Sequence, residues 1–331
     1  MDCKKLYEIV YALAARDGRE AVLFGADGPA AREAFTRSLS CDDFPEVWFE
    51  LPLQGKPWLD FHSLVAYKDV AGKQPSYAGH DGFYNDGLSW FASQEPGKVR
   101  QLALSYDTST GDVESPAVQL LVNGRDPSVS LGYLDAVGRD DLCPAYQTFV
   151  QSIPKEWYPC YTGVFPRRST ASDDPWVRIE CLVGDTKQQA YEKDVSLLRK
   201  DLASIGLVDL NAELIFGTHM LACSPFPLEL QFNVGPDGVA QPTLSATVRF
   251  FPADWTNEER KEQIAKLMER LQEMGLVDDR WTLLEEVAYA ERVKFGEESV
   301  SISCIPAFLK LRWREAQPPD AKAYLVAWAH S

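Results

Sequence analysis

Hydrophobic and polar residues alternate one by one in ten short stretches of the chain, and these stretches form five consecutive pairs. Such alternation is typical of β-strands that have one apolar and one polar face. Each pair flanks a polar segment rich in turn-forming residues, which favours an antiparallel connection. The predicted pairs are 47–53 with 59–68, 100–106 with 117–123, 158–165 with 176–183, 228–234 with 243–251, and 299–313 with 321–328.

Segments with helical spacing separate these pairs of strands. Apolar residues at positions 191, 195, 198, 202 and 205 share one face of a predicted helix, which Gly206 ends. A second helix is predicted to begin at a capping box of Thr256 and Glu259 and to end at Gly275. Residues 1–16, 84–92 and 144–153 are further predicted helices. The order is therefore a helix followed by two strands, repeated along the chain.

This order excludes several common architectures. In a parallel barrel a helix follows every strand, and a β-sandwich has no place for regularly spaced helices. No Pro- or Ser-rich linker divides the chain. We therefore predict a single α+β domain over residues 1–331, with N-terminal helices over about 1–43 and hairpin–helix repeats over about 44–330. Its ten antiparallel strands would close into a β-barrel surrounded by helices.

The alternation also predicts which side chains face the barrel axis. Amphipathic helices need an apolar surface to cover, so the apolar strand faces should point outward and the polar faces inward. A ten-stranded barrel is wide enough to hold a ligand, and a lumen of charged side chains suits a solvated chamber. The alternative is a two-layer α+β protein with solvated polar faces. The predicted inward residues include Trp48, Glu50, Asp60, His62, Trp176, Arg178, Glu180, Glu229, Gln231 and Arg249.

The charge balance restricts the possible partners. The 331 residues include 49 acidic and 33 basic side chains, for a net charge of −16 and a pI of about 4.7. Such a surface is unsuited to nucleic acid or to an anionic membrane. The acidic excess falls mainly in predicted helices and turns, whereas basic residues recur on the inward strand faces. A small anionic ligand would therefore be bound by basic side chains inside the barrel.

Cysteine usage and the N-terminal segment point to the cytoplasm. The seven cysteines are scattered and contain no C-x-x-C pair, which fits a reducing compartment. Glu8 interrupts the apolar run of residues 1–16, so this segment is predicted to be an amphipathic helix and not a signal peptide. No stretch is long and apolar enough for a membrane span.

The last pair of strands carries the most specific sequence feature. It contains Phe-Leu-Lys-Leu-Arg-Trp at 308–313 and Ala-Lys-Ala-Tyr at 321–324. Together with the repeated order of elements, the step from Lys322 to Tyr324 resembles the ABBA-type, or PT-barrel, prenyltransferases. These include the fungal indole and the cyanobactin peptide prenyltransferases. The resemblance covers most of the chain, from about residue 47 to 328.

The resemblance implies a soluble enzyme with a ten-stranded barrel around a solvent-filled lumen. Such an enzyme transfers a prenyl group from dimethylallyl or a longer prenyl diphosphate to an aromatic acceptor. The acceptor would be an indole or a phenol, either on a small molecule such as free tryptophan or on a ribosomal peptide. The resemblance implies binding neither to nucleic acid nor to a membrane.

The resemblance also implies roles for particular residues. Charge-assisted hydrogen bonds would hold the diphosphate, with Lys68 near one rim, through Arg178, Arg249, Lys310 and Lys322. Aromatic faces would shield the allylic cation from water, through Tyr324, Tyr161 and Trp176. Glu50 would accept the proton that the aromatic ring loses, and Asp60 and His62 are the reserve candidates for this role.

The acidic pairs of the chain, such as Asp42-Asp43, lack the further carboxylate of a D-D-x-x-D motif, which chelates magnesium diphosphate in other prenyltransferases. The diphosphate is therefore expected to be met by cationic side chains without a required cofactor, although Mg²⁺ remains possible. Two alternatives to an enzyme remain. One is a non-catalytic barrel protein that binds a small ligand or a peptide, and the other is an interaction scaffold with a filled core.

Overall fold

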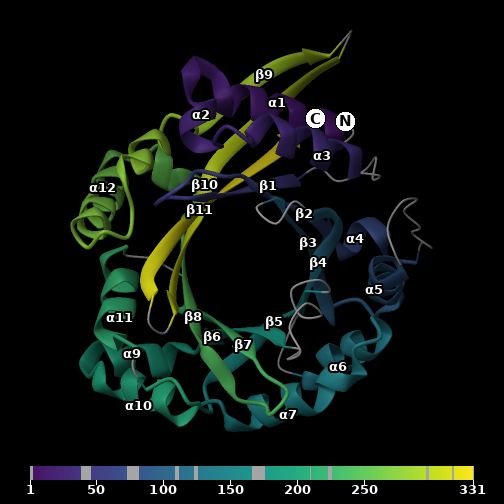
Figure 1. The fold of residues 1–331 in the computed structure, drawn as a ribbon, viewed down its shortest axis with the longest axis vertical. Helices are drawn as coiled ribbons and strands as arrows, with labels where there is room; N and C mark the ends of the chain where they lie inside the picture. Colours follow the sequence, from purple (N-terminus) through teal and green to yellow (C-terminus); the bar gives the residue numbers. More distant parts are fainter. Residues whose placement is uncertain are drawn as a thin grey trace.

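The strands of the computed structural model close into a barrel (Figure 1). The structure describes residues 3–38, 46–72, 82–108, 112–122, 126–165, 176–208, 210–222, 226–295, 298–314 and 317–330. All neighbouring strands are antiparallel, and the last strand pairs with the first, which closes the ring. The ten strands of the ring are β1 (Glu46–Pro52), β2 (Asp60–Ala66), β3 (Val99–Asp107), β4 (Asp112–Val122), β5 (Trp157–Val164), β6 (Val177–Val183), β7 (Glu229–Val234), β8 (Ala240–Arg249), β10 (Glu298–Arg314) and β11 (Gln317–His330).

The ten-stranded antiparallel barrel predicted from the sequence is therefore confirmed. One further strand, β9 (Tyr289–Phe295), was not predicted. It pairs with the first part of β10, between residues 298 and 304, whereas β8 pairs with the second part, between residues 308 and 314. The long strand β10 thus extends past the ring, and β9 covers its extension (Figure 1).

Helices surround the barrel on its outer side (Figure 1). The α-helices in the described part of the chain are α1 (Cys3–Ala15), α2 (Glu20–Leu23), α3 (Gly28–Ser38), α4 (Tyr67–Val70), α5 (Gly82–Ser93), α6 (Pro127–Ala136), α7 (Cys143–Ser152), α9 (Asp185–Lys193), α10 (Ser196–Ser204), α11 (Ala212–Leu221) and α12 (Glu258–Glu273). Four short 3₁₀ segments join them, at η1 (Arg16–Gly18), η3 (Asp140–Leu142), η4 (Pro252–Trp255) and η5 (Asp279–Leu283). No described helix has both the length and the apolar character that crossing a membrane requires.

The main apolar core lies between the strands and the helices. Phe49 of β1 and Phe61 of β2 pack against Tyr7 of α1, with ring centroids 5.5 and 5.1 Å apart. On another part of the ring, Phe232 of β7 packs against Phe149 of α7 at 5.4 Å. All five side chains are fully buried. The apolar strand faces therefore point outward, as predicted, because the helices cover them.

Two helix predictions need correction. The helix predicted over 191–205 is two helices, α9 and α10, because the Asp194 carboxylate accepts a hydrogen bond from the Ser196 amide and interrupts the helix there. Helix α12 is confirmed, but its cap is Asn257, whose side chain accepts from the Arg260 amide. The predicted capping box of Thr256 and Glu259 is therefore wrong.

Candidate active site

The barrel encloses a chamber of about 380 Å³, within the size range of small-molecule sites. The predicted alternative of a filled core is therefore wrong. Strand side chains that were predicted to face inward form most of the wall. All eight predicted site residues line the chamber: Glu50, Arg178, Arg249, Lys310, Lys322, Tyr161, Trp176 and Tyr324. The reserve candidates Asp60 and His62 also line it, whereas Lys68 is an exposed residue of helix α4 and lies outside the wall.

Strand register places Glu50 at the centre of a polar cluster. Glu50 on β1 lies directly opposite Tyr324 on β11 and Asp60 on β2. Its carboxylate accepts hydrogen bonds from the Lys322 ammonium and from the Tyr324 hydroxyl, and His62 Nε2 lies 3.0 Å from Oε2. We call Glu50, Asp60, His62, Lys322 and Tyr324 the Glu50 cluster.

Glu50 is an ionised carboxylate in spite of its burial. Burial alone would raise its pKa, but the charge of Lys322 and the hydrogen bond from His62 outweigh this effect. The pKa of Glu50 is therefore held well below its usual value. The chamber thus contains a buried negative charge that Lys322 neutralises.

A chain of hydrogen bonds orients His62 toward Glu50. Gln119 Nε2 donates to Ser105 Oγ at 2.8 Å, and Ser105 Oγ lies 2.7 Å from His62 Nδ1. Because the ionised carboxylate of Glu50 can only accept, the His62 nitrogen that faces it, Nε2, carries a proton and donates to Glu50. Ser105 and Gln119 were not predicted as site residues. Their alternation with apolar neighbours on β3 and β4 is the sequence signal that would have placed them inward.

Asp60 is a second buried carboxyl group beside Glu50. Its side chain accepts hydrogen bonds from the Thr108 amide at 2.8 Å and from Trp58 Nε1 at 3.0 Å. Burial and the nearby charge of Glu50 raise the pKa of Asp60. The oxygens of Asp60 and of Glu50 alike are in contact with donors of the chamber wall, so Asp60 stays the reserve candidate for the base.

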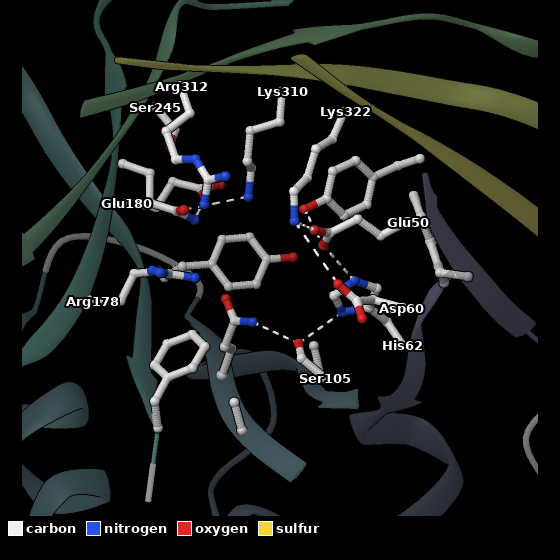
Figure 2. A pocket seen from close by; sticks show the side chains of 18 of the residues that line it. Glu50, Asp60, His62, Ser105, Arg178, Glu180, Ser245, Lys310, Arg312 and Lys322 are labelled. Carbon is white, nitrogen blue, oxygen red and sulfur yellow. Dashed lines mark hydrogen bonds and ion pairs between the residues drawn. The ribbon is translucent and has the colours of Figure 1, made fainter. Parts of the chain in front are cut away.

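A second cluster lies across the chamber (Figure 2). Glu229 on β7 accepts two hydrogen bonds from the Arg249 guanidinium on β8, at 2.7 and 2.9 Å. Gln231 Nε2 donates to Glu180 on β6 at 2.6 Å, and Lys310 Nζ lies 3.4 Å from Gln231 Oε1. We call Glu180, Glu229, Gln231, Arg249 and Lys310 the Glu180 cluster. Figure 2 shows Lys310 and Lys322 pointing into the chamber between Glu180 and Glu50.

The two carboxyl groups of this cluster differ in charge. Burial and the charge of Glu229 raise the pKa of Glu180 well above its usual value. Burial also acts on Glu229, but the Arg249 guanidinium outweighs it and lowers the pKa of Glu229. The pair therefore holds one proton, on Glu180, and one negative charge, on Glu229.

Aromatic rings line two parts of the chamber. Tyr324 stacks on Phe308, with ring centroids 4.1 Å apart, and Lys310 Nζ lies 5.2 Å from the centroid of Tyr324. The Arg178 guanidinium lies over Phe165 at 4.1 Å and over Trp176 at 5.3 Å. Phe308 and Phe165 were not predicted. Phe308 shares the inward face of its strand with Lys310, two positions away, so its place could have been inferred.

Three further charged residues lie where β10 and β11 approach their connection. Asp320 Oδ2 accepts from Arg312 at 2.9 Å and from Arg314 at 2.5 Å. Within the described residues, six basic side chains line the chamber, namely Arg178, Arg249, Lys310, Arg312, Arg314 and Lys322. Six acidic side chains line it as well, namely Glu50, Asp60, Asp107, Glu180, Glu229 and Asp320. Four of these six acidic residues, Glu50, Asp60, Glu180 and Glu229, were predicted to face inward.

No group of three or more His, Cys, Asp or Glu side chains in the described ranges is arranged to hold a metal ion.

The sequence matches no protein-family model and no curated protein, but solved structures do match the fold. The 5-dimethylallyltryptophan synthase of Streptomyces coelicolor is 14% identical, with a TM-score of 0.53 over 97% of each chain. PriB, in a ternary complex with L-tryptophan and dimethylallyl thiolodiphosphate, is 13% identical, with a TM-score of 0.54 over 98% of this chain and 96% of its own. AnaPT of Neosartorya fischeri is 9% identical, with a TM-score of 0.52 over 99% of this chain and 92% of its own. The chain therefore has the ABBA, or PT-barrel, fold that the sequence predicted.

Proposed function

We propose that the protein is an aromatic prenyltransferase. It would transfer a prenyl group from dimethylallyl diphosphate, or a longer homologue, to an indole. The observation that carries this proposal is a buried carboxylate, Glu50, that faces cationic side chains in a chamber walled by aromatic rings. The similar structures support the substrate class, because one is a dimethylallyltryptophan synthase and another is a complex with L-tryptophan and a prenyl diphosphate analogue.

The reaction would use opposite charges at different places in the chamber. The bond between the allylic carbon and the diphosphate oxygen breaks, and its electron pair leaves with the diphosphate. Basic side chains stabilise that negative charge, namely Arg178, Arg249, Lys310 and Lys322. The faces of Tyr324, Tyr161 and Trp176 shield the allylic cation. The indole π electrons form the new carbon–carbon bond, and the proton that the acceptor loses passes to Glu50.

Lys322 would couple diphosphate binding to the strength of the base. Before binding, Lys322 donates to Glu50 and its charge lowers the pKa of that carboxylate. A bound diphosphate carries more negative charge than Glu50, so it would attract the flexible Lys322 side chain. The departure of Lys322 opens Glu50 Oε1 and raises the pKa of Glu50. The base therefore becomes effective only when the prenyl donor is present.

A direct assay tests the proposed function. The protein is incubated with dimethylallyl diphosphate and with free tryptophan, free tyrosine or a tryptophan-containing peptide, and the products are identified by mass spectrometry. We expect an acceptor that has gained one C5H8 unit, most rapidly with tryptophan. We propose that no metal cofactor is required, since basic side chains are in place for the diphosphate, so turnover should persist in EDTA. Addition of Mg²⁺ tests whether the ion assists.

The alternative function predicts a different result. A non-catalytic barrel protein would be stabilised against heat by dimethylallyl thiolodiphosphate but would modify none of the acceptors. If neither dimethylallyl nor geranyl thiolodiphosphate raises the melting temperature, the chamber does not hold a prenyl diphosphate and the proposal fails.

His62 is expected to act as a positioning residue for Glu50. Its hydrogen bond lowers the pKa of Glu50, so His62→Phe should raise that pKa. Glu50 acts as a base only when it is deprotonated. As the solution is acidified, kcat/KM of His62→Phe should therefore begin to fall at a higher pH than kcat/KM of the unmodified protein. The carboxylate also loses a hydrogen bond of about 1.5–3 kcal/mol that holds it in place, and because a misplaced base transfers protons less well, kcat should fall about tenfold or more. His62→Gln keeps an N–H donor and should restore most of the activity. An unchanged pH profile in His62→Phe would contradict this role.

We also propose that residues 1–331 form one domain that works in the cytoplasm. Strand β1 pairs with β11, so the barrel needs both ends of the chain to close. Free thiols fit a reducing compartment, and the cysteines whose side chains are described are free: Cys143, Cys160, Cys181 and Cys304.

A further inference from the structure

We propose that Glu180 is part of the diphosphate site and stays there as a neutral carboxylic acid, whose proton is shared with Glu229 and removes one negative charge from beside the bound anion. This inference rests on the proposed function in one respect, namely that a diphosphate occupies the chamber. It adds a glutamate to the cationic side chains of the site. The sequence pattern predicted that this glutamate faces the lumen but gave it no role.

The geometry of two carboxyl groups carries the proposal. Glu180 and Glu229 line the chamber, are 4% and 3% exposed, and are hydrogen-bonded to each other. Two carboxylates in such contact cannot both be ionised, so the pair shares one proton. Arg249 forms a two-bond fork with Glu229, which fixes the negative charge on Glu229 and leaves the proton to Glu180.

The groups around Glu180 come from four neighbouring strands. Tyr161 on β5 is opposite Glu180 in the register, and burial raises the pKa of its hydroxyl, so Tyr161 stays neutral. The sulfur of Cys160, on the same strand, donates to the Glu180 carbonyl and also stays a neutral thiol, because burial raises its pKa. Gln231 on β7 donates to Glu180, next to Glu229 on the same strand. The two cations that face the pair are Arg249 on β8 and Lys310 on β10.

The charge balance of the chamber explains why the neutral form is needed. The described lining has equal numbers of basic and acidic side chains, so an incoming diphosphate meets no excess of positive charge. If Glu180 were ionised, Lys310 and Arg249 would be shared between two carboxylates and the anion. With a proton shared with Glu229, Glu180 places no repelling charge next to Lys310, which stays available to the anion. Binding of diphosphate then favours the protonated form still further, because an anion raises the pKa of an adjacent carboxyl.

The test uses inorganic pyrophosphate, which binds without any transfer reaction. Its affinity is measured by calorimetry between pH 6 and 9.5 for the unmodified protein, Glu180→Gln and Glu180→Leu. Glutamine is a permanently neutral donor of similar shape, so Glu180→Gln should bind as tightly as the unmodified protein at low pH. As the pH rises through the titration of the pair, the unmodified protein should lose affinity relative to Glu180→Gln, by up to about tenfold per pH unit. Glu180→Leu is also permanently neutral, so its affinity should not fall relative to Glu180→Gln as the pH rises.

Infrared difference spectra provide a second readout that does not depend on where the pair titrates. The protonated carboxyl stretch should be present in the unmodified protein, shift when pyrophosphate is added, and be absent from Glu180→Gln. Glu50→Gln is the matched control, because it removes a buried carboxylate outside the Glu180–Glu229 pair and should leave this band in place.

The outcomes separate the inference from the proposed function. If pyrophosphate binds but the carboxyl band does not shift, the role of Glu180 is rejected and the diphosphate site stands. The same conclusion follows if the band is absent and the unmodified protein and Glu180→Gln have the same affinity at low pH and lose it equally at high pH. If neither pyrophosphate nor dimethylallyl thiolodiphosphate binds, the proposed function fails together with the inference.

Discussion

Replacement of Glu50 by glutamine is expected to lower kcat for indole prenylation by about 10²- to 10⁴-fold, the range that general base catalysis supplies. Glutamine keeps the size of the side chain but cannot take up the proton that the acceptor loses. Binding of dimethylallyl thiolodiphosphate should be retained or become tighter, because Lys322 no longer has Glu50 as a competing partner. Steady-state kinetics and calorimetry with the analogue measure the two effects separately.

The matched control is Glu46→Gln, which makes the same substitution on the same strand. Glu46 accepts a hydrogen bond from Trp48 Nε1, and a glutamine oxygen can also accept it. Glu46→Gln should therefore keep normal kinetics. Full activity of Glu50→Gln would show that another group accepts the proton. Asp60→Asn is then the next variant, since Asp60 is the neighbouring carboxyl on β2.

The largest effect on stability is expected for Arg249→Met. The change leaves the 3% exposed Glu229 without the guanidinium that holds its negative charge. Removal of one partner from a buried ion pair costs about 3–5 kcal/mol of the free energy of unfolding. Urea unfolding at neutral pH measures the loss. The double variant Arg249→Met with Glu229→Gln should recover much of the stability, because the buried charge is then absent.

The pH dependence gives this prediction a definite sign. Arg249 lowers the pKa of Glu229 in the folded protein, so the pair contributes stability above the usual glutamate pKa and loses it as the pH falls through the lowered value. The difference between the unmodified protein and Arg249→Met should therefore shrink in acid.

Arg312→Met is the control for a less buried pair. Asp320 keeps Arg314 as a partner and is 27% exposed, so the loss should stay below about 1 kcal/mol. Equal losses for Arg249→Met and Arg312→Met would contradict the special role of the buried pair.

The fold could be predicted from the sequence because strand alternation is a local property. Side chains two residues apart share one face of a strand, whatever the strand pairs with. The order of Arg178 and Glu180, or of Lys310 and Arg312, is enough to place each pair on a polar face. The strand period failed for β9, in which the adjacent charged residues Glu291 and Arg292 interrupt the alternation. The helical period failed at Asp194, where a side-chain hydrogen bond interrupts the helix.

The sequence by itself determined that the protein has ten strands with polar inner faces, and hence which residues line the chamber. Only the tertiary structure decided how those residues combine. Strand register brings Lys322 to Glu50 across 272 residues of sequence and joins Glu180 to Glu229 on neighbouring strands. The charge of a buried carboxyl depends on burial and on the charges within a few ångströms, and an alternating pattern contains no information on either. For this reason the sequence could propose Glu50 as a base, but its pairing with Lys322 and the proton on Glu180 required the closed barrel.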